Sequence, residues 1–445
     1  SVSEVEASEA LDPLLHTART VLATGLLDAA AIRSLYTQTG ERVRAAAVRA
    51  AARPKLTTLE AVTRPLGIRD PRAVDAEAAR CVDETARIAA FGGENRLPES
   101  APPRHLSLQI NRALKDLMIK YPEMTIFGED VAQKGGVYTV TAGLAASFRG
   151  NRVFNTLLDE TTILGMAQGH GAMGLLPFPE IQYLAYFHNA CDQIRGEAAS
   201  LQFFSNGQFD SPMVMRIASL GYQKGFGGHF HNDNSFSALR DIPGLVIACP
   251  SRGDDAAGML RTCAALARVE GKVVAFMEPI ALYMAKDLHE PKDGGWVFPY
   301  PAPGEHVPLG EPRHYGPTAA ELLIITFGNG VPMSLRAARR LTDATGAEAA
   351  VFDLRWLKPL NRRRIVEAAR AAGRVLIVDE GRRTGGIAEE LFTLLDEEAG
   401  ADLPKARVTG ADSYIPLADA ANLVLLSEDD IVAAARRLLE ERPNP

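Results

Sequence analysis

Short apolar runs alternate with segments of helical periodicity along most of this chain, and the alternation occurs in two series. The first series lies between residues 105 and 277, and the second lies between residues 322 and 398. Strands that are separated by helices form mostly parallel sheets with helices on both faces. The pattern therefore predicts an α/β protein with two open parallel-sheet domains.

The apolar runs give the expected elements of both domains. In the first domain we expect a helix directly after Glu160, strands at 125–128, 153–156, 178–183, 213–218, 245–248 and 273–277, and helices at 106–120, 188–203 and 254–266. In the second domain we expect strands at 322–327, 349–353 and 375–379 and helices at 333–342, 362–371, 387–398 and 428–440.

Residues 1–100 differ from the rest because they are rich in alanine and arginine at helical spacing. One helix is expected to begin at an Asp28 cap and to run to Ala52 before Pro54, and another covers 75–90. The segment has too little apolar surface for its own core, so we expect it to pack on another domain or subunit. We therefore divide the chain into a helical extension (1–100), a first α/β domain (101–295), a linker (296–320) and a second α/β domain (321–445).

The composition is that of an ordinary soluble globular protein, with 47% hydrophobic residues, 23% charged residues and a formal net charge of −7. The arginine-rich stretches 42–53 and 362–364 lie in helical patterns, and we interpret them as solvated helix faces. No run approaches the roughly 18 apolar residues of a membrane span, and no signal segment opens the chain. We therefore expect a cytoplasmic location and no binding to nucleic acid or membrane.

Cysteines and short motifs exclude several kinds of site. The cysteines are far apart in sequence, which favours free thiols in a reducing compartment and no zinc site: Cys81, Cys191, Cys249 and Cys263. The chain has no Gly-x-x-x-x-Gly-Lys loop, no Gly-x-Gly-x-x-Gly after the first strand and no Gly-x-Ser-x-Gly turn. We therefore expect any phosphate-bearing cofactor to be held largely by something else.

Two carboxylates are candidates for acid–base chemistry. Glu129 follows the expected strand 125–128, and ligands of open α/β sheets bind beyond the carboxyl ends of strands. A solvated loop carboxylate is an equal alternative for Glu129. Glu160 precedes an apolar helix that has four glycines between residues 165 and 174, so another backbone can approach this helix closely. Taken alone, the pattern around Glu160 favours the capped start of a buried core helix.

A glycine-rich loop that begins at Gly225 holds His229 and His231, which share a face if the segment is extended. The nearby asparagines and the single Asp233 make a poor ligand set for a transition metal. We therefore favour acid–base chemistry or substrate contact by one histidine, and we expect no metal site. For Tyr186, core packing is the default interpretation.

Seven short motifs occur in order along the two α/β domains: Gly128-Glu-Asp-Val, Gly135-Gly-Val-Tyr, Val153-Phe-Asn-Thr-Leu-Leu-Asp-Glu160, Glu180-Ile-Gln-Tyr, Asp192-Gln-Ile, Ile242-Pro-Gly-Leu and Asp353-Leu-Arg-Trp-Leu-Lys-Pro-Leu. Together they resemble the beta subunit of the thiamine-diphosphate-dependent decarboxylating component of 2-oxoacid dehydrogenase complexes. The resemblance covers about residues 105–440. It implies a pyrimidine-binding domain followed by a transketolase-type carboxy-terminal domain.

The resemblance implies roles for residues that match the family's motifs. Glu160 falls on the glutamate that bonds the aminopyrimidine ring nitrogen of the cofactor, and Glu129 falls on a nearby acidic residue of a proton relay. Tyr186 falls beside the pyrimidine, and His231 falls on the active-site histidine. Further candidates are Leu158 and Gln182 for cofactor binding and His229 for catalysis.

The implied function is oxidative decarboxylation of a 2-oxoacid with acyl transfer to a lipoyl carrier. Where the family usually has His-Ser-Gln, this chain has His231-Asn-Asp-Asn234, preceded by His229. Such extra hydrogen-bonding groups would suit the hydroxyls of a ketose, so transketolase-like transfer of a two-carbon unit to a carrier or sugar is an alternative. A scaffold subunit without catalysis is the alternative from another class of protein.

The amino-terminal segment resembles the helical end of an alpha subunit in three stretches: Leu11-Asp-Pro-Leu, Ala29-Ala-Ala-Ile and Arg42-Val-Arg-Ala-Ala-Ala. We infer that the chain is the carboxy-terminal portion of a fused alpha–beta protein or that it pairs with a trimmed alpha chain. The family's diphosphate-binding Gly-Asp-Gly motif belongs to the alpha part, so thiamine diphosphate and magnesium are expected to be held largely by that partner. The resemblance also implies self-association of beta-type chains into a heterotetramer.

Overall fold

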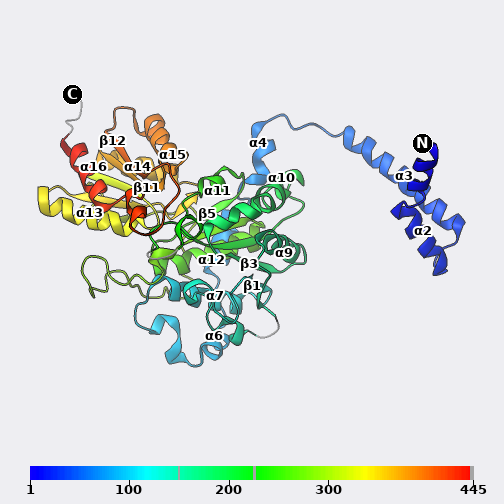
Figure 1. The fold of residues 1–445 in the computed structure, drawn as a ribbon, viewed down its shortest axis with the longest axis horizontal. Helices are drawn as coiled ribbons and strands as arrows, with labels where there is room; N and C mark the ends of the chain where they lie inside the picture. Colours follow the sequence, from blue (N-terminus) through cyan, green and yellow to red (C-terminus); the bar gives the residue numbers. More distant parts are fainter. Residues whose placement is uncertain (149–150, 224–226, 441–445) are drawn as a thin grey trace. The chain divides into compact units, whose positions relative to one another are not determined.

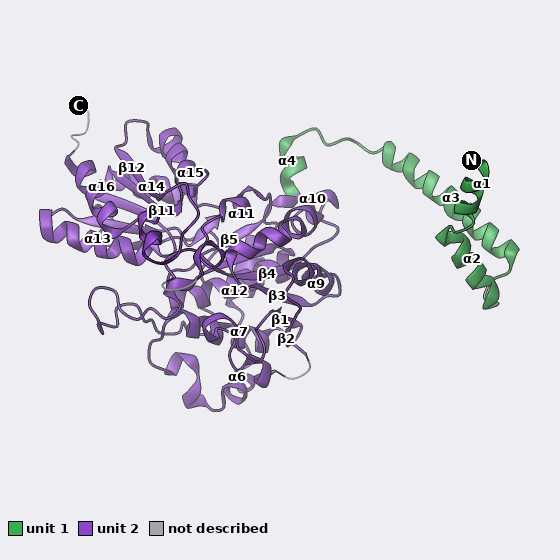
Figure 2. Ribbon diagram, in the orientation of Figure 1, with its two compact units in different colours: residues 1–64 green, residues 65–445 purple. Residues whose placement is uncertain are grey.

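The computed structural model describes residues 1–148, 151–223 and 227–440. The chain divides into two compact units, residues 1–64 and residues 65–445, which Figure 2 shows in different colours. The boundary between the units lies within the 1–100 segment, so the last part of that segment belongs to the same unit as the sheets.

The first unit is helical, as the sequence predicts. It contains α1 (Val2–Glu9), α2 (Pro13–Ala23), α3 (Ala29–Ala51) and α4 (Leu59–Thr63). The Asp28 cap is present, because its carboxylate accepts a hydrogen bond from the backbone N–H of Ala31 at 2.7 Å. No residue of these four helices is buried. Apolar side chains such as Leu11 and Leu26 are 82% and 76% exposed, so this unit has no core of its own.

The larger unit contains a seven-stranded sheet, which can be followed in Figure 1. Its strands are β1 (Met124–Gly128), β2 (Val153–Asn155), β3 (Leu176–Ile181), β4 (Met213–Ser219), β5 (Val246–Ala248), β6 (Val273–Pro279) and β10 (Trp356–Lys358). Their order is β10-β5-β6-β4-β3-β1-β2, and every neighbouring pair is parallel except β10 with β5. We call this sheet and its helices the first lobe.

Helices cover both faces of this sheet. Alternate residues of β1 show the two layers, because Ile126 is buried in one cluster with Leu114 and Leu260, whereas Phe127 is buried in another cluster with Ile163. The helices are α5 (Pro71–Ala79), α6 (Glu84–Phe91), α7 (Leu106–Lys120), α8 (Leu144–Ser147), α9 (Glu160–Ala172), α10 (Leu201–Phe204), α11 (Ser237–Asp241) and α12 (Gly253–Glu270).

The second lobe is built on a five-stranded sheet with the order β12-β11-β8-β9-β7, in which only β7 is antiparallel to its neighbour. Its strands are β7 (Arg313–Tyr315), β8 (Leu322–Thr326), β9 (Ala349–Asp353), β11 (Val375–Arg382) and β12 (Lys405–Gly410). Its helices are α13 (Gly330–Thr345), α14 (Arg362–Ala372), α15 (Ile387–Leu394) and α16 (Glu428–Glu440). The structure confirms the predicted α/β class with two mostly parallel sheets.

The two lobes are joined by β10, which follows β9 of the second lobe in sequence but pairs with the first lobe, with Trp356 opposite Ala248. Near this junction, the carboxylate of Asp255 accepts hydrogen bonds from Arg355 at 2.8 Å and from Arg313 at 2.7 Å. One hydrophobic cluster also contains buried residues of both lobes. These contacts explain why residues 65–445 form one unit.

Most expected elements are present within a few residues of their predicted bounds. Strands β7, β10 and β12 were not predicted, and the expected helix 75–90 is two helices, α5 and α6. Strands β7 and β10 have only three residues each, which is too short for a recognisable alternation of apolar and polar residues.

The predicted long helix at 188–203 is wrong. The segment is broken into the 3₁₀ helix η5 (Leu184–Ala190), the π-helical η6 (Gln193–Ala198) and α10. Side chains of α9 occupy carbonyls that a regular helix would use for its own hydrogen bonds. The Thr161 hydroxyl donates to the carbonyl of Asn189 at 2.9 Å, and the Gln168 amide donates to the carbonyl of Gln193 at 3.1 Å.

All four cysteines are free thiols, as expected, with Cys249 and Cys263 buried and Cys81 exposed. In the part of the chain that the structure describes, no group of three or more His, Cys, Asp or Glu side chains is arranged to hold a metal ion. None of the described helices combines the length and the apolar character needed to cross a membrane.

Candidate active site

Four candidate side chains belong to segments that follow neighbouring strands of the seven-stranded sheet. Glu129 directly follows β1, Glu160 follows β2 after a short loop, and Gln182 directly follows β3. The loop that carries His231 follows β4. Because β4, β3, β1 and β2 are adjacent in this order, the sheet directs these segments to one edge. Ligands of open α/β sheets bind at this kind of edge.

Glu160 is the first residue of α9 and is only 4% exposed. Its Oε2 atom accepts a hydrogen bond from Nδ2 of Asn189 at 3.4 Å. The side chain of Glu160 therefore lies at the amino-terminal end of α9, which carries a partial positive charge. The fold thus supplies a buried carboxylate at the edge of the sheet.

Glu129 is half-buried and lies beside Glu160. Burial, followed by the negative charges of Glu160 and Asp130, raises the pKa of Glu129 to about 7. A carboxyl group with a pKa near neutrality can hold and release a proton at physiological pH. The two glutamates can therefore share one acidic proton.

The 3₁₀ helix η5 brings further side chains to the same place. The hydroxyl of Tyr186 lies 3.5 Å from Nε2 of His231, and Asn189 donates to Glu160. Burial and the negative charges of Glu129 and Glu160 raise the pKa of Tyr186. Asn189 was not predicted as a site residue. Its spacing of three residues from Tyr186 is the signal that could have found it, because such residues share one face of a 3₁₀ helix.

Gln182 and Leu158 have different surroundings. The Gln182 amide donates to the carboxylate of Asp130 at 3.3 Å, so Gln182 contacts the residue next to Glu129. Leu158 and its neighbour Leu157 are 78% and 77% exposed. An uncovered apolar surface therefore lies in the loop just before α9.

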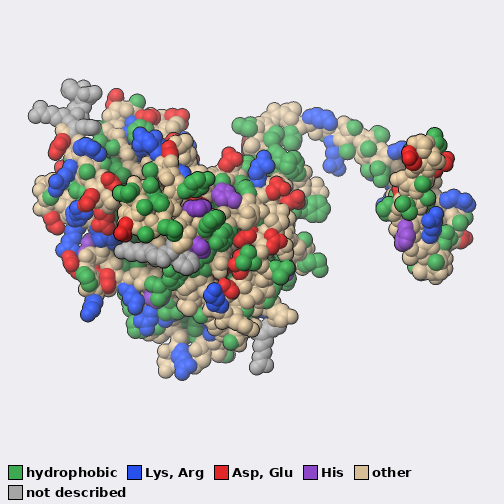
Figure 3. Space-filling model, in the orientation of Figure 1, with side chains coloured by type: hydrophobic (Ala, Val, Ile, Leu, Met, Phe, Trp, Pro, Cys, Tyr) green, Lys and Arg blue, Asp and Glu red, His purple; other side chains and the backbone are tan. Residues whose placement is uncertain are grey.

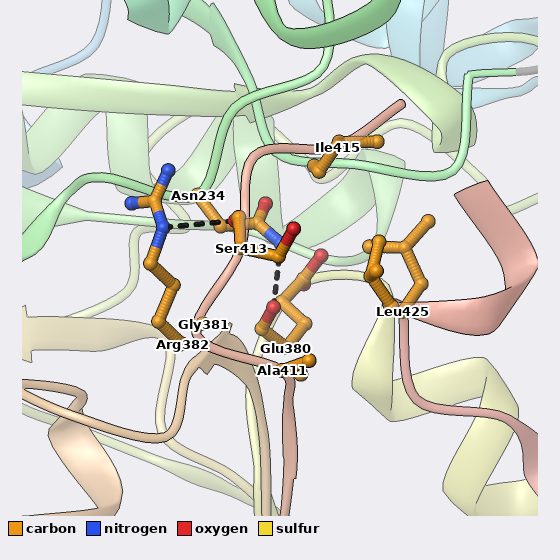
Figure 4. A pocket seen from close by; sticks show the side chains of 10 residues that line it. Asn234, Glu380, Gly381, Arg382, Ala411, Ser413, Ile415 and Leu425 are labelled. Atoms are coloured by element: carbon orange, nitrogen blue, oxygen red, sulfur yellow. Dashed lines mark hydrogen bonds between the residues drawn. The ribbon is translucent and has the colours of Figure 1, made fainter. Parts of the chain in front are cut away.

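The loop of His231 is anchored by its own polar side chains. Asn232 accepts a hydrogen bond from the backbone N–H of Gln223 at 2.9 Å. Asn234 donates to the carbonyl of Glu380 at 2.5 Å, which ties the loop to the second lobe (Figure 4). Both asparagines are buried, so the structure uses them to hold the loop in place.

His229 is exposed, and its ring contacts differ from those of His231. Its ring packs against Phe230 and Tyr414, with centroid distances of 4.1 Å and 5.3 Å. His231 instead contacts the ring of Tyr183 edge-on, with centroids 4.5 Å apart. The start of the same loop, Gly225 and Phe226, lies outside the described residues.

The glycines of α9 fall into two groups. A side chain at Gly165 or Gly169 would meet no atom within 4 Å, so this face of the helix is open. A Cβ at Gly171 would come within 3.0 Å of Pro212, so the absence of a side chain permits close packing there. Met173, at the end of the helix, is 82% exposed.

Residues 105–286 match the family described as "Transketolase, pyrimidine binding domain", and residues 316–431 match "Transketolase, C-terminal domain". A solved structure named "Split gene transketolase, inactive beta4 tetramer" has a similar fold, with a TM-score of 0.59 and 20% identity. The similarity covers 76% of this chain and 99% of that chain.

Curated relatives share more of the sequence. The chain is 35% identical to the 2-oxoisovalerate dehydrogenase subunit beta of Pseudomonas aeruginosa, over 69% of this chain and 88% of that protein. It is 34% identical to the protein of the same name from Bacillus subtilis, over 75% and 97%. It is 30% identical to the pyruvate dehydrogenase E1 component subunit beta of Acholeplasma laidlawii, again over 75% and 97%. The chain therefore belongs to the family of beta subunits of the decarboxylating component of 2-oxoacid dehydrogenase complexes, as its motifs predict.

Proposed function

We propose that this chain supplies the acid–base half of a thiamine-diphosphate-dependent enzyme that decarboxylates a 2-oxoacid and passes the acyl group to a lipoyl carrier. The observation that carries the proposal is the buried Glu160 beside Glu129, whose pKa is about 7. Groups that exchange protons during catalysis work best when their pKa is close to the operating pH.

The surroundings of Glu160 fit the aminopyrimidine ring of thiamine diphosphate. A buried carboxylate can accept a hydrogen bond from a protonated ring nitrogen, and the exposed Leu157 and Leu158 offer apolar surface to a flat ring. When bound, the cofactor supplies a carbon nucleophile for the 2-oxo carbon and accepts the electron pair that departing carbon dioxide leaves behind. Glu160 holds the ring nitrogen in this proposal, and Leu158 contacts the ring.

The other candidate residues move protons or position these groups. Glu129 exchanges a proton with Glu160, and Gln182 holds the adjacent Asp130 in place. Tyr186 lies beside the ring and orients His231 through the contact at 3.5 Å. His231 then acts as an acid–base group toward the substrate, and His229 contacts the acceptor.

The diphosphate and magnesium are held largely by an alpha-type subunit or fused alpha domain in this proposal. The open face of α9 at Gly165 and Gly169 and the exposed Met173 support a close partner at this site. The exposed apolar side chains of residues 1–64 support packing on such a partner as well. We further propose that beta-type chains self-associate to give a cytoplasmic heterotetramer that serves a lipoyl carrier domain.

The ketose-transfer alternative rested on the polar side chains that follow His231. In the structure Asn232 and Asn234 are bound within the loop and to the second lobe, and Asp233 pairs with Arg382 at 3.2 Å. These side chains are therefore engaged without a substrate. No observation favours ketose transfer over 2-oxoacid decarboxylation.

The test uses the chain reconstituted with its alpha-type partner, thiamine diphosphate and magnesium. Carbon dioxide release is measured with pyruvate and 2-oxoisovalerate, and ketose consumption is measured alongside. We expect carbon dioxide release, which Glu160→Gln lowers by about 10²–10⁴-fold without loss of folding. The control Glu397→Gln, at a surface glutamate with 63% side-chain exposure, keeps full activity.

Two results would overturn the proposal. Ketose consumption without carbon dioxide release would assign the chain to ketol transfer. Unchanged turnover of Glu160→Gln would leave the chain as a scaffold. Calorimetry of the isolated chain tests the partner separately, because sub-micromolar affinity for thiamine diphosphate, a Kd below about 10⁻⁶ M, would contradict a cofactor held largely by the alpha part.

A further inference from the structure

A cavity of about 890 Å³ lies where the loop of His231 meets the second lobe. The first lobe lines it with His188 of η5 and with Asp233 and Ser235 of the loop. The second lobe contributes Arg382 and Tyr414. Figure 3 shows histidine side chains gathered among hydrophobic ones on one face of the larger unit. The cavity is large enough for part of a flexible organic group, since ligand pockets span about 300–1,000 Å³.

A chain of hydrogen bonds connects four of these side chains. The Ser235 hydroxyl donates to one carboxylate oxygen of Asp233, and the other oxygen pairs with Arg382 at 3.2 Å. The same Ser235 oxygen lies 2.9 Å from Nε2 of His188. A hydroxyl has one proton to donate, and Ser235 gives it to the carboxylate. The Ser235 oxygen must therefore accept the Nε2–H of His188, which assigns the Nε2–H tautomer to the neutral ring.

This tautomer leaves Nδ1 of His188 as the basic atom of the ring. Nδ1 has no hydrogen-bond partner among the described residues, and His188 is exposed at the cavity wall. Asp233 is only 8% exposed and lies between Ser235 and Arg382 in the chain of hydrogen bonds. Through Ser235, the carboxylate of Asp233 holds the imidazole of His188 in one orientation. Nδ1 is therefore set to take up and deliver a proton in the cavity.

The same short helix connects the cavity with the glutamate pair. Within η5, Tyr186 contacts His231 and Asn189 donates to Glu160, whereas His188 contacts Ser235. Tyr186 and Asn189 thus contact the residues around Glu160, whereas His188 contacts a residue that lines the cavity. An acceptor that enters through the cavity would reach His188 while the acyl donor is held near Glu160.

We propose that His188 is the general acid of the acyl-transfer step and that Ser235 and Asp233 position it, an inference that rests on the proposed function. The acceptor is a cyclic disulfide on a carrier arm. The acyl carbon forms a bond to one sulfur, the S–S bond breaks, and its electron pair leaves with the second sulfur. That sulfur takes the proton from Nδ1 of the His188 imidazolium and becomes a thiol. The bond between the acyl carbon and the cofactor would then break with its electron pair returning to the cofactor, and the hydroxyl proton of the acyl unit would pass to solvent. Solvent returns one proton to Nδ1, which balances the step.

The kinetic test compares two acceptors in the reconstituted complex with thiamine diphosphate and magnesium. The dye 2,6-dichlorophenolindophenol takes electrons without forming a thiol, whereas a lipoyl domain requires one. We expect His188→Gln to lower acylation of the lipoyl domain by about 10²-fold and to leave dye-coupled carbon dioxide release within about twofold. The control His289→Gln, at an exposed histidine of the segment between the lobes, changes neither rate.

The structural test needs no turnover. In ¹⁵N-histidine NMR spectra of the complex at high pH, His188 should carry its proton on Nε2, and Ser235→Ala should convert it to a mixture of tautomers. Three results would overturn the inference. They are an Nδ1–H tautomer in the unaltered protein, equal rates of lipoyl acylation with and without His188, and an equal loss of rate with both acceptors in His188→Gln. If the unaltered complex released no carbon dioxide from any 2-oxoacid, the proposed function would be overturned instead. The NMR measurement of the His188 tautomer would still test the hydrogen bond between His188 and Ser235.

Discussion

Two pairs of buried or half-buried glutamates lie in the first lobe, and their surroundings differ. Glu180 and Glu278, on β3 and β6, share the guanidinium of Arg216 on the strand between them, with N–O distances of 2.8 Å and 2.7 Å. Glu129 and Glu160 follow β1 and β2, and among the described residues no ion pair joins them to a cation. The fold supplies a cation to one pair, and among the described residues it supplies none to the other.

The difference separates structural from chemical carboxylates. Arg216 is 1% exposed, and Glu278 and Glu180 raise its pKa despite this burial, so its guanidinium stays charged between them. Burial raises the pKa of Glu180 as well, and the charge of Arg216 opposes that rise. No described cation pairs with Glu129, and burial with the negative charges of Glu160 and Asp130 raises its pKa to about 7, so its proton is exchangeable near neutral pH. A strongly shifted carboxyl pKa without a nearby cation marks a candidate functional site. A shifted pKa within a buried ion-pair network has a structural explanation.

The largest stability effect is expected at the structural pair. Arg216→Met removes the cation and leaves two buried carboxylates without a compensating charge, although Glu278 still accepts a hydrogen bond from Tyr283, so the free energy of unfolding should fall by about 3–5 kcal/mol. Denaturant unfolding of the chain measures this loss. The matched control Arg268→Met removes an arginine whose side chain is 57% exposed and pairs with Glu123, and should cost at most about 1 kcal/mol. Equal losses in the two variants would show that Arg216 does not hold the cluster together.

A smaller effect, dependent on pH, is expected at Glu129. Its pKa is about 7 in the folded state and 4.5 for an ordinary glutamate, so between these values the folded state holds a proton that the unfolded state has lost. The stability of the unaltered chain should therefore fall as pH rises through this window, and Glu129→Gln should not show this fall. Denaturant unfolding at pH 5, 6, 7 and 8 measures the free energy of unfolding of both proteins. The value for Glu129→Gln minus the value for the unaltered chain should grow with pH and level off above about 7. A difference that is constant over this range would contradict the raised pKa.

Much of this comparison was accessible from the sequence. Apolar periodicity located β1, β4 and β6, because each is a continuous run of buried residues. Glu160 could be singled out because its motif is one of seven that occur in a fixed order along the chain. Its partner Glu129 followed from its place at the end of a predicted strand. Local pattern was sufficient for the strands, whereas the two glutamates needed the order of motifs along both domains to be preferred over ordinary structural residues.

Features that depend on distant segments were not predicted. The cluster of Arg216 needs the strand order β6-β4-β3, which no local pattern specifies. The broken helix at 188–203 depends on hydrogen bonds from α9, so the position of His188 and Asn189 could not be derived from helical periodicity. Strand β10 pairs with the other lobe, and its three residues carry no signal of that pairing.

The smallest effect is expected at Asn189, the residue of η5 that donates a hydrogen bond to Glu160. Its hydrogen bond of 3.4 Å is long and its side chain is exposed, so Asn189→Ala should lower carbon dioxide release by only about two- to threefold. Asn189→Asp is the sharper variant, because it places a third carboxyl group beside Glu160 and Glu129. Repulsion among these groups should raise the pKa of Glu129 further and move the pH profile of kcat/KM upward, with a larger loss than the alanine variant at pH 7. The same pH profile in the aspartate and alanine variants would mean that a cation already compensates the charges of Glu160 and Glu129. The distinction between this pair and the Arg216 cluster would then fail.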